Sequence, residues 1–379
     1  MRTAVLGMGN MGSQYAVMIA AGKIKGMELA AVTRIRPERM ESLKKQLPKE
    51  LPIYESAQKL YEAVDNGELS LDAVIVVTPH DSHERLVCEA FSRELHVLCD
   101  KPAGVYSAQA RRMEEMYEKA AEEKPDLRFG FIFHQRTFPM YQYLQEMVKS
   151  GVYGKLKRVN WVITDWYRPD AYYSIVSWRG TWAMDGGGVL LNQCPHNLDL
   201  LQWIAGMPEQ VQGFCHEGKH HFIEVEDDVT AYFEWENGAT GVMIASTGEA
   251  PGVNRLEISC ENALIVCENG TLRICELDKP ESEYRAETEN IFVRPKGVWT
   301  EKTFSEPENP YELVLNDFVQ GRMTAQGKEA RNSLILSNAI YLSSWECAKI
   351  KIPEKGTGAE REFEQRFETQ LRKKQSEEE

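Results

Sequence analysis

The chain has 379 residues, of which 42% are hydrophobic and 27% charged, an ordinary globular composition whose length suits two domains. A formal net charge of -14 without a basic stripe argues against a nucleic-acid partner, because its phosphates would be repelled. No apolar run approaches the ~20 residues that span a bilayer, and the first residues lack the form of a signal peptide. We therefore expect a cytoplasmic protein without a membrane partner. The eight cysteines include no CxxC pair, which predicts reduced thiols and no metal site.

The first third of the chain alternates short apolar runs with amphipathic stretches. The expected strands are 3–7, 27–33, 71–78, 96–99 and 127–133, and the expected helices are 11–23, 56–65, 82–93 and 107–122. This alternation predicts a doubly wound α/β domain over residues 1–134, with a parallel sheet covered on both faces. Ligands of such sheets bind at the carboxyl ends of the strands.

The pattern changes after residue 135. A helix at 138–150, a strand at 155–166 and an apolar helix at 189–205 are followed by β-type runs. Asn237-Gly238 and Asn269-Gly270 are hairpin signals between these runs. We predict an α/β domain over residues 135–350 with a mostly antiparallel sheet, including late helices at 309–320 and 332–349. Residues 351–379 are predicted to be a charged tail, a solvated or frayed helix rather than a functional arm.

A glycine-rich motif, G-M-G-N-M-G at residues 7–12, lies between the first strand and the first helix. Its glycines permit a tight turn, close approach to a pyrophosphate and close helix–strand packing, while the helix N-terminus faces the phosphates. In this context the motif predicts a Rossmann dinucleotide site. The motif residues assigned to the cofactor are Gly7, Gly9, Asn10, Met11 and Gly12.

The end of the second strand differs from the usual NAD pattern. A carboxylate is expected there to bind the ribose, but the chain reads T-R-I-R-P-E-R at residues 33–39. Arg34 could bind a 2′-phosphate, because guanidinium pairs well with phosphate. This favours NADP and leaves NAD open; the alternative is that the arginines are only solvated surface residues.

Four segments together resemble the glucose–fructose oxidoreductase, inositol dehydrogenase and rhizopine catabolism (Gfo/Idh/MocA) family. They are VLGMGNMG at 5–12, VVTPHDSH at 76–83, CDKPAG at 99–104 and GGGVLLNQCPHNLDL at 186–200. The resemblance implies a Rossmann domain, then an α/β domain with a large open antiparallel sheet that often forms the oligomer contact. It also implies that the late helices pack back on the first domain, and it makes a homodimer or homotetramer the expected assembly.

The resemblance further assigns the chemistry. Lys101 of D-K-P matches the family's E-K-P lysine beside the nicotinamide, where an ammonium can stabilise a developing alkoxide. Asn192 and His196 match the family's D-x-x-x-H pair, expected on one face of a helix, with asparagine in place of aspartate. An amide cannot exchange a proton, so proton transfer is assigned to His196. These three residues are predicted to be catalytic and to bind substrate. Further cofactor contacts are assigned to Thr78, Pro79, His80, His83, Asp100 and Lys101.

An aromatic and arginine-rich segment precedes the glycine run at 186–188. Its candidate substrate residues are Tyr167, Arg168, Trp178 and Arg179. Aromatic rings suit the C–H faces of sugars, and arginines suit a carboxylate or phosphate. We expect about half of the segment's aromatics to be core residues. A neutral sugar, cyclitol or glycoside is favoured over an acidic sugar.

The sequence therefore predicts an NAD(P)-dependent oxidoreductase that transfers a hydride between nicotinamide and a secondary alcohol of a sugar, cyclitol or glycoside. Two alternatives remain. One is a keto-glycoside-forming enzyme with transient redox and elimination. The other is a cofactor-binding regulator without turnover.

Overall fold

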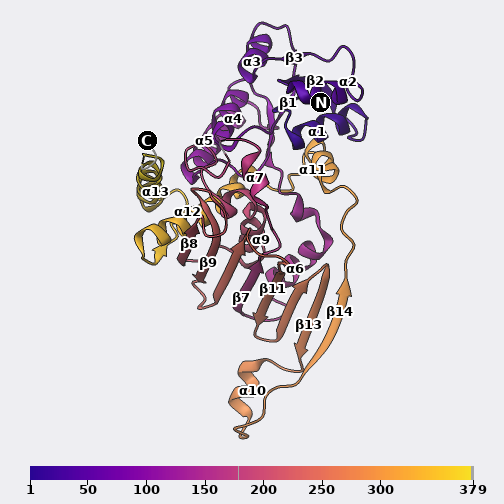
Figure 1. The fold of residues 1–379 in the computed structure, drawn as a ribbon. Coiled ribbons are helices and arrows are strands. Elements are labelled where there is room, and N and C mark those ends of the chain that lie inside the picture. The colour runs from indigo at the N-terminus through magenta and orange to yellow at the C-terminus, as the bar shows by residue number, and fades with distance from the viewer. Residues whose placement is uncertain (178, 377–379) are drawn as a thin grey trace. The chain divides into compact units, whose positions relative to one another are not determined.

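The computed structural model describes residues 1–177 and 179–376 (Figure 1). The chain divides into two compact units. The first contains residues 1–137 and 308–334, and the second contains residues 138–307 and those from 335 onward.

The first unit is built on a six-stranded sheet in the order β3-β2-β1-β4-β5-β6, and every pair is parallel. Its strands are β1 (Arg2–Leu6), β2 (Glu28–Thr33), β3 (Ile53–Tyr54), β4 (Ala73–Val76), β5 (His96–Cys99) and β6 (Phe129–Phe131). All four residues of β4 are fully buried, as expected of a strand covered on both faces. The predicted doubly wound sheet is confirmed. The two-residue strand β3 was not predicted, because it is too short to show a periodic pattern.

Helices connect these strands in sequence. They are α1 (Asn10–Ala20), α2 (Pro37–Lys44), α3 (Ala57–Asp65), α4 (His83–Phe91) and α5 (Ser107–Glu123), with short 3-10 turns η1 (His80–Ser82) and η2 (His134–Thr137). The late helix α11 (Pro310–Val319) also belongs to this unit. Its Val314, Leu315 and Phe318 share one buried cluster with Val5 and Tyr15. The late helix α11 thus packs within the core of the first unit.

The second unit contains a nine-stranded sheet in the order β14-β13-β12-β11-β7-β10-β9-β8-β15. The strands are β7 (Leu156–Ile163), β8 (Gln210–Glu217), β9 (Glu226–Glu234), β10 (Thr240–Ser246), β11 (Asn254–Cys260), β12 (Ala263–Glu268), β13 (Thr271–Leu277), β14 (Gly297–Thr303) and β15 (Ile350–Lys351). All neighbours are antiparallel except β7 and β10. Asn269 and Gly270 both have positive φ at the β12–β13 turn, as a type I′ hairpin requires. The predicted mostly antiparallel sheet is confirmed.

The helices of the second unit are α6 (Pro139–Ser150), α7 (Asp170–Ser174), α8 (Val189–Asn192), α9 (Pro195–Ala205), α10 (Glu281–Glu287) and α13 (Gly358–Ser376), while α12 (Gly327–Glu346) begins in the first unit. The single helix predicted over 189–205 is wrong, because Pro195 starts a new helix. Proline lacks the N–H that a continuous helix needs and disfavours helical backbone at the residue before it. Within the described residues, no helix has the length and apolarity to cross a membrane.

The end of the chain forms a helix that is only partly solvated. Within the tail predicted at 351–379, residues 358–376 form α13, and the expectation of a merely solvated or frayed helix is wrong for its buried face. Phe363, Phe367 and Leu371 are buried at spacings of four residues, and the ring of Phe367 stacks on Trp345 with centroids 5.4 Å apart. The dense charges of this segment hid a narrow apolar stripe.

Candidate functional site

The glycine turn after β1 is held by close backbone packing. Gly7 has φ +99, and a Cβ there would lie 2.4 Å from the carbonyl oxygen of Val77. A Cβ on Gly12 would lie 1.9 Å from the carbonyl oxygen of Gly7, whereas a Cβ on Gly9 would meet nothing within 4 Å. The first and third glycines are therefore needed by the fold itself. Gly9 leaves open space at the N-terminus of α1, where free N–H groups favour a phosphate.

The segment after β2 brings arginines to this turn. Arg39 on α2 donates a hydrogen bond to the side-chain oxygen of Asn10. Arg34 is anchored by its backbone N–H, which donates to the carbonyl oxygen of Tyr54 at 2.7 Å, and its side chain is exposed. Arg34 was a predicted cofactor residue, whereas Arg39 was not predicted. The sequence did contain a signal for Arg39. It lies in the first turn of the helix that follows the strand end expected to bind the ribose.

Two turns at the carboxyl edge of the sheet carry the residues assigned to the nicotinamide end. Val76 and Cys99 are register partners in the parallel pair β4–β5, so Thr78 and Lys101 follow neighbouring strand ends. The backbone N–H of Lys101 donates to Asp100 Oδ1 at 2.9 Å. Burial raises the pKa of Asp100 to about 6, and the nearby Lys101 ammonium opposes that shift. The Lys101–Pro102 peptide bond is cis.

His83 links these two turns. Its Nε2 lies 2.8 Å from the carbonyl oxygen of Thr78, and its Nδ1 lies 2.9 Å from that of Pro102. The residue is 1% exposed; burial lowers the pKa of His83, and the two carbonyl contacts raise it. Both ring nitrogens are thus engaged by the protein, which favours a positioning role over the direct cofactor contact expected for His83. His80 is half-buried, with its ring centroid 6.1 Å from that of His83.

Three further residues surround Asp100 and Lys101 and were missed by sequence reasoning. Burial and the Asp100 carboxylate raise the pKa of Tyr311 to about 12, and they also raise the pKa of Tyr15 well above its usual value. The His134 ring lies 4.4 Å from that of Tyr311. Burial and the Lys101 charge lower the pKa of His134 to about 4. The position of His134 just after a strand of the parallel sheet was the available signal.

Asn192 and His196 lie in the second unit, on two successive helices. Asn192 is the last residue of α8, and its Nδ2–H donates to the carbonyl oxygen of Gly187 at 3.1 Å. His196 is the second residue of α9 and is 6% exposed. Lys101 belongs to the first unit. The convergence of Lys101 and His196 on one substrate oxygen therefore stays a prediction.

Glu226 holds the start of α8 in place. Its carboxylate accepts hydrogen bonds from the N–H of Gly188 at 2.8 Å, the N–H of Leu190 at 2.9 Å and the hydroxyl of Tyr341 at 2.7 Å. Burial raises the pKa of Glu226 to about 7, although these bonds lower it. A Cβ on Gly188 would lie 1.8 Å from the Glu226 carbonyl oxygen, so glycine is required there by packing. Only the fold reveals this acid, because it lies on β9.

Glu226→Gln is expected to lower the free energy of unfolding by about 1–3 kcal/mol, because one of the N–H donors would face an amide NH₂ instead of an oxygen. Urea unfolding of the full chain measures this difference. Glu234→Gln on the same strand is the control: its carboxylate forms a partly exposed pair with Lys349, and such pairs contribute about 1 kcal/mol or less. Equal losses in the two variants would contradict the supporting role of Glu226.

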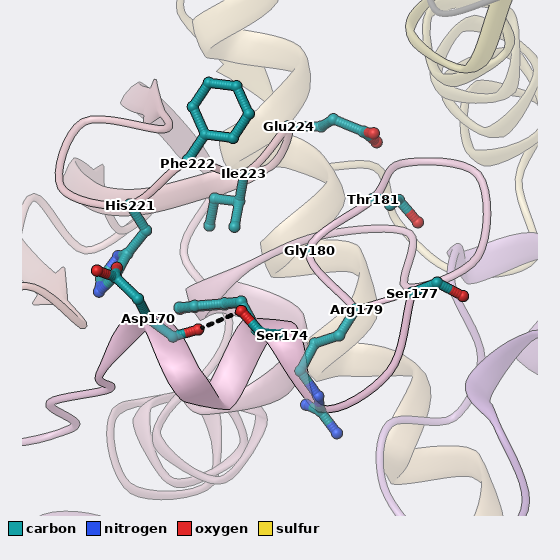
Figure 2. A pocket seen from close by; sticks show the side chains of 11 residues that line it. Asp170, Ser174, Ser177, Arg179, Gly180, Thr181, His221, Phe222, Ile223 and Glu224 are labelled. Carbon is teal, nitrogen blue, oxygen red and sulfur yellow. Dashed lines mark hydrogen bonds between the residues drawn. The ribbon is translucent and has the colours of Figure 1, made fainter.

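The predicted substrate segment lies on two loops of the second unit. Tyr167 is 49% exposed, Arg168 and Arg179 are half-buried, and Trp178 lies outside the residues that the structure describes. A cavity of about 440 Å³ is present beside Arg179 (Figure 2). Its lining comes from residues 170–181 on one side and 221–224 on the other: Asp170, Tyr173, Ser174, Ser177, Arg179, Gly180, Thr181, His221, Phe222, Ile223 and Glu224.

The parallel sheet with its glycine turn, followed by an open mixed sheet, defines a two-domain NAD-binding oxidoreductase. Residues 1–126 match the family described as "Oxidoreductase family, NAD-binding Rossmann fold", and residues 141–266 match "GFO/IDH/MocA C-terminal domain". The chain belongs to the Gfo/Idh/MocA family of oxidoreductases.

Similar proteins agree with this membership. The myo-inositol 2-dehydrogenase of Thermotoga maritima is 26% identical over 71% of this chain and 75% of its own length. The scyllo-inositol 2-dehydrogenase (NAD(+)) of Bacillus subtilis is 25% identical over 72% of this chain and 74% of its own. The WlbA dehydrogenase of Bordetella pertussis, solved with NADH and UDP-GlcNAcA, has a TM-score of 0.74 at 23% identity and covers 94% of this chain and 99% of its own, which shows likeness of fold.

Proposed function

We propose that this protein is an NAD(P)-dependent dehydrogenase that acts on a secondary alcohol of a sugar, cyclitol or glycoside. The observation that carries the proposal is Lys101 at the carboxyl end of β5 in a Rossmann sheet, combined with a histidine at the matching family position in the second unit. The names of the inositol dehydrogenases support the substrate class. An intact lysine and histidine also argue against a regulator without turnover.

The residues have distinct roles in this proposal. The nicotinamide, when bound, exchanges the hydride with the carbinol carbon. In the oxidation direction His196 accepts the hydroxyl proton, and the Lys101 ammonium stabilises the negative charge that develops on the oxygen. Asn192 donates a hydrogen bond to the substrate and cannot take up a proton. Binding of the dinucleotide is assigned to the glycine turn and to the backbone around Thr78.

We favour NADP over NAD because of the two arginines beside the glycine turn. The exposed guanidinium of Arg34 and that of Arg39, which already contacts Asn10, are suited to a 2′-phosphate. NAD remains the alternative.

Arg34→Gln and Arg39→Gln are each expected to raise the KM for NADP by about tenfold or more and to leave the KM for NAD nearly unchanged. A charge-assisted hydrogen bond contributes about 1.5–3 kcal/mol, and 1.4 kcal/mol corresponds to tenfold. Steady-state kinetics with each cofactor measures this ratio. Arg85→Gln, which removes an exposed pair with Glu89 on α4, is the control. A parallel rise for both cofactors would rule out the 2′-phosphate assignment.

A panel of neutral sugars, acidic sugars and cyclitols, run with NAD and NADP in parallel, tests the proposed function. Absorbance of the reduced nicotinamide reports turnover. Net formation of reduced cofactor supports the dehydrogenase. Product without net redox would instead indicate the elimination chemistry. Tight dinucleotide binding without any turnover would indicate a regulator.

A homo-oligomer is part of the proposal. The nine-stranded sheet exposes the large apolar side chains Phe214, Leu264 and Trp299, which are 52%, 36% and 52% exposed. Large apolar side chains exposed on a sheet are typical of association sites. Light scattering coupled to size-exclusion chromatography measures the assembly. The cytoplasmic location stays a prediction from the sequence.

A further inference from the structure

We propose that the substrate carries an anionic group, a carboxylate or a phosphate, which is bound by Arg168 and Arg179. The inference rests on the proposed dehydrogenase function and narrows its substrate class. It reverses the preference for a neutral sugar that the sequence suggested.

The two arginines share one aromatic ring. The guanidinium carbon of Arg168 lies 5.0 Å from the centroid of Tyr172, and that of Arg179 lies 4.3 Å from it. Arg179 also donates a hydrogen bond to the hydroxyl of Tyr172. The two guanidinium groups repel each other because both are cationic, and the ring's attraction for each cation offsets this repulsion only weakly. A bound anion would remove the repulsion.

Arg168 has hydrogen-bonding capacity that the protein leaves unused. Its Nη1 donates to the carbonyl oxygen of Tyr167 at 3.0 Å. Its Nε is buried, and among the described residues no atom accepts a hydrogen bond from it. No described carboxylate forms an ion pair with Arg168, although the chain carries a net charge of -14. A buried donor without an acceptor is unfavourable, so the protein holds Arg168 in this place at an energetic cost.

The arginine pair is tied to the helices that carry Asn192 and His196. The Arg168 guanidinium also lies 5.5 Å from the ring of Trp166, whose Nε1–H donates to Asn197 Oδ1 at 3.3 Å. Gln193 Nε2–H donates to the Tyr172 hydroxyl at 3.2 Å. Asn197 follows His196 directly in the chain, and Gln193 follows Asn192. The two aromatic rings that frame Arg168 are therefore each anchored one residue away from a candidate catalytic side chain.

The backbone of Arg168 is fixed from both sides. Its N–H donates to the carbonyl oxygen of Thr247 at 2.9 Å, and its carbonyl accepts from His221 Nε2–H at 2.8 Å. His221 Nδ1 in turn lies 2.8 Å from Oδ2 of Asp227, a fully buried carboxylate that also accepts the backbone N–H groups of residues 219, 220 and 221. A buried pair thus preorganises one arginine, which is the arrangement expected of a binding residue rather than of a solvated surface charge.

The guanidinium groups of the two arginines favour an anion as their ligand. Guanidinium forms two parallel hydrogen bonds with a carboxylate or a phosphate, a match that a neutral hydroxyl cannot supply. The cavity of about 440 Å³ is lined by both Arg179 and His221 (Figure 2). It provides room for the part of the substrate that extends from the anionic group.

The test compares substrates that differ only in charge: D-glucose with D-glucuronate and D-glucose 6-phosphate, and D-galactose with D-galacturonate. The unmodified enzyme is expected to have a kcat/KM at least about tenfold higher for one kind of acidic sugar than for its neutral partner. The glucuronate and galacturonate measurements test a carboxylate, and the glucose 6-phosphate measurement tests a phosphate. Arg168→Gln is expected to remove this preference by raising the KM for the acidic sugar by at least about tenfold. Arg168→Lys keeps the positive charge but loses the planar guanidinium group with its paired donors. Its preference for the acidic sugar is expected to lie between those of the unmodified enzyme and Arg168→Gln.

Arg273→Gln is the matched control, because Arg273 also stacks on an aromatic ring, with its guanidinium 5.7 Å from Trp299 in the same unit. Its substrate preference is expected to equal that of the unmodified enzyme. Neutral sugars used as well as their acidic partners would overturn the anionic substrate and leave the dehydrogenase standing. Turnover of neither class, and of no member of the wider panel of sugars and cyclitols, would overturn the dehydrogenase itself. If Arg168→Gln fails to fold, the comparison of acidic with neutral sugars on the unmodified enzyme still tests the proposal.

Discussion

Lys101→Met and His196→Asn are each expected to lower kcat by about 100-fold or more, while the dissociation constant for the dinucleotide changes by less than about threefold. General acid–base groups and charge-stabilising donors typically contribute 10²–10⁴ to the rate. Methionine keeps the length of Lys101 and removes its charge, and asparagine keeps a polar group at 196 that cannot accept a proton. Pre-steady-state hydride transfer and nucleotide titration measure the two quantities separately.

The controls for this pair are Lys45→Met and His216→Asn, which replace exposed residues of the first and second unit. Both are expected to retain the turnover of the unmodified enzyme. Near-normal turnover in Lys101→Met or His196→Asn would remove the role given to that side chain. Loss of turnover together with loss of nucleotide binding would place the residue in cofactor binding instead.

Gly12→Ala and Gly9→Ala are expected to fail in different ways. A Cβ on Gly12 would lie 1.9 Å from the backbone oxygen of Gly7, so this variant is expected to lose about 3 kcal/mol or more of its free energy of unfolding. A Cβ on Gly9 meets nothing within 4 Å, so its fold is expected to be unaffected. The added methyl would instead occupy the space where the backbone approaches a pyrophosphate, and the affinity for NAD(P) is expected to fall by at least about 100-fold.

Thermal unfolding without nucleotide and isothermal titration with NAD and NADP separate these two effects. Gly22→Ala is a suitable comparison, because Gly22 also meets nothing within 4 Å, has φ +71 and lies beyond the C-terminal end of α1. It is expected to show only the modest cost of a left-handed backbone, with normal nucleotide affinity. Normal nucleotide affinity in Gly9→Ala would refute the placement of the phosphates at this turn.

The sequence by itself determined the fold class and the cofactor end of the protein. Apolar strands of four residues or more, the G-M-G-N-M-G turn and the Asn-Gly hairpins are local signals, because each depends on residues close together in the chain. The family motifs likewise marked Lys101, Asn192 and His196. Where a local pattern was ambiguous, the prediction was wrong: the helix at 189–205 breaks at Pro195, and charged residues masked the apolar stripe of α13.

Only the tertiary structure decided which residues support the site, because its hydrogen bonds join residues far apart in the chain. The carboxylate of Glu226 binds the start of α8, at residues 188 and 190, and His83 joins the turns at Thr78 and Pro102. The link from His221 to the carbonyl of Arg168 spans 53 positions. Such pairings are set by how the strands and loops pack, and no period or motif along the chain encodes them.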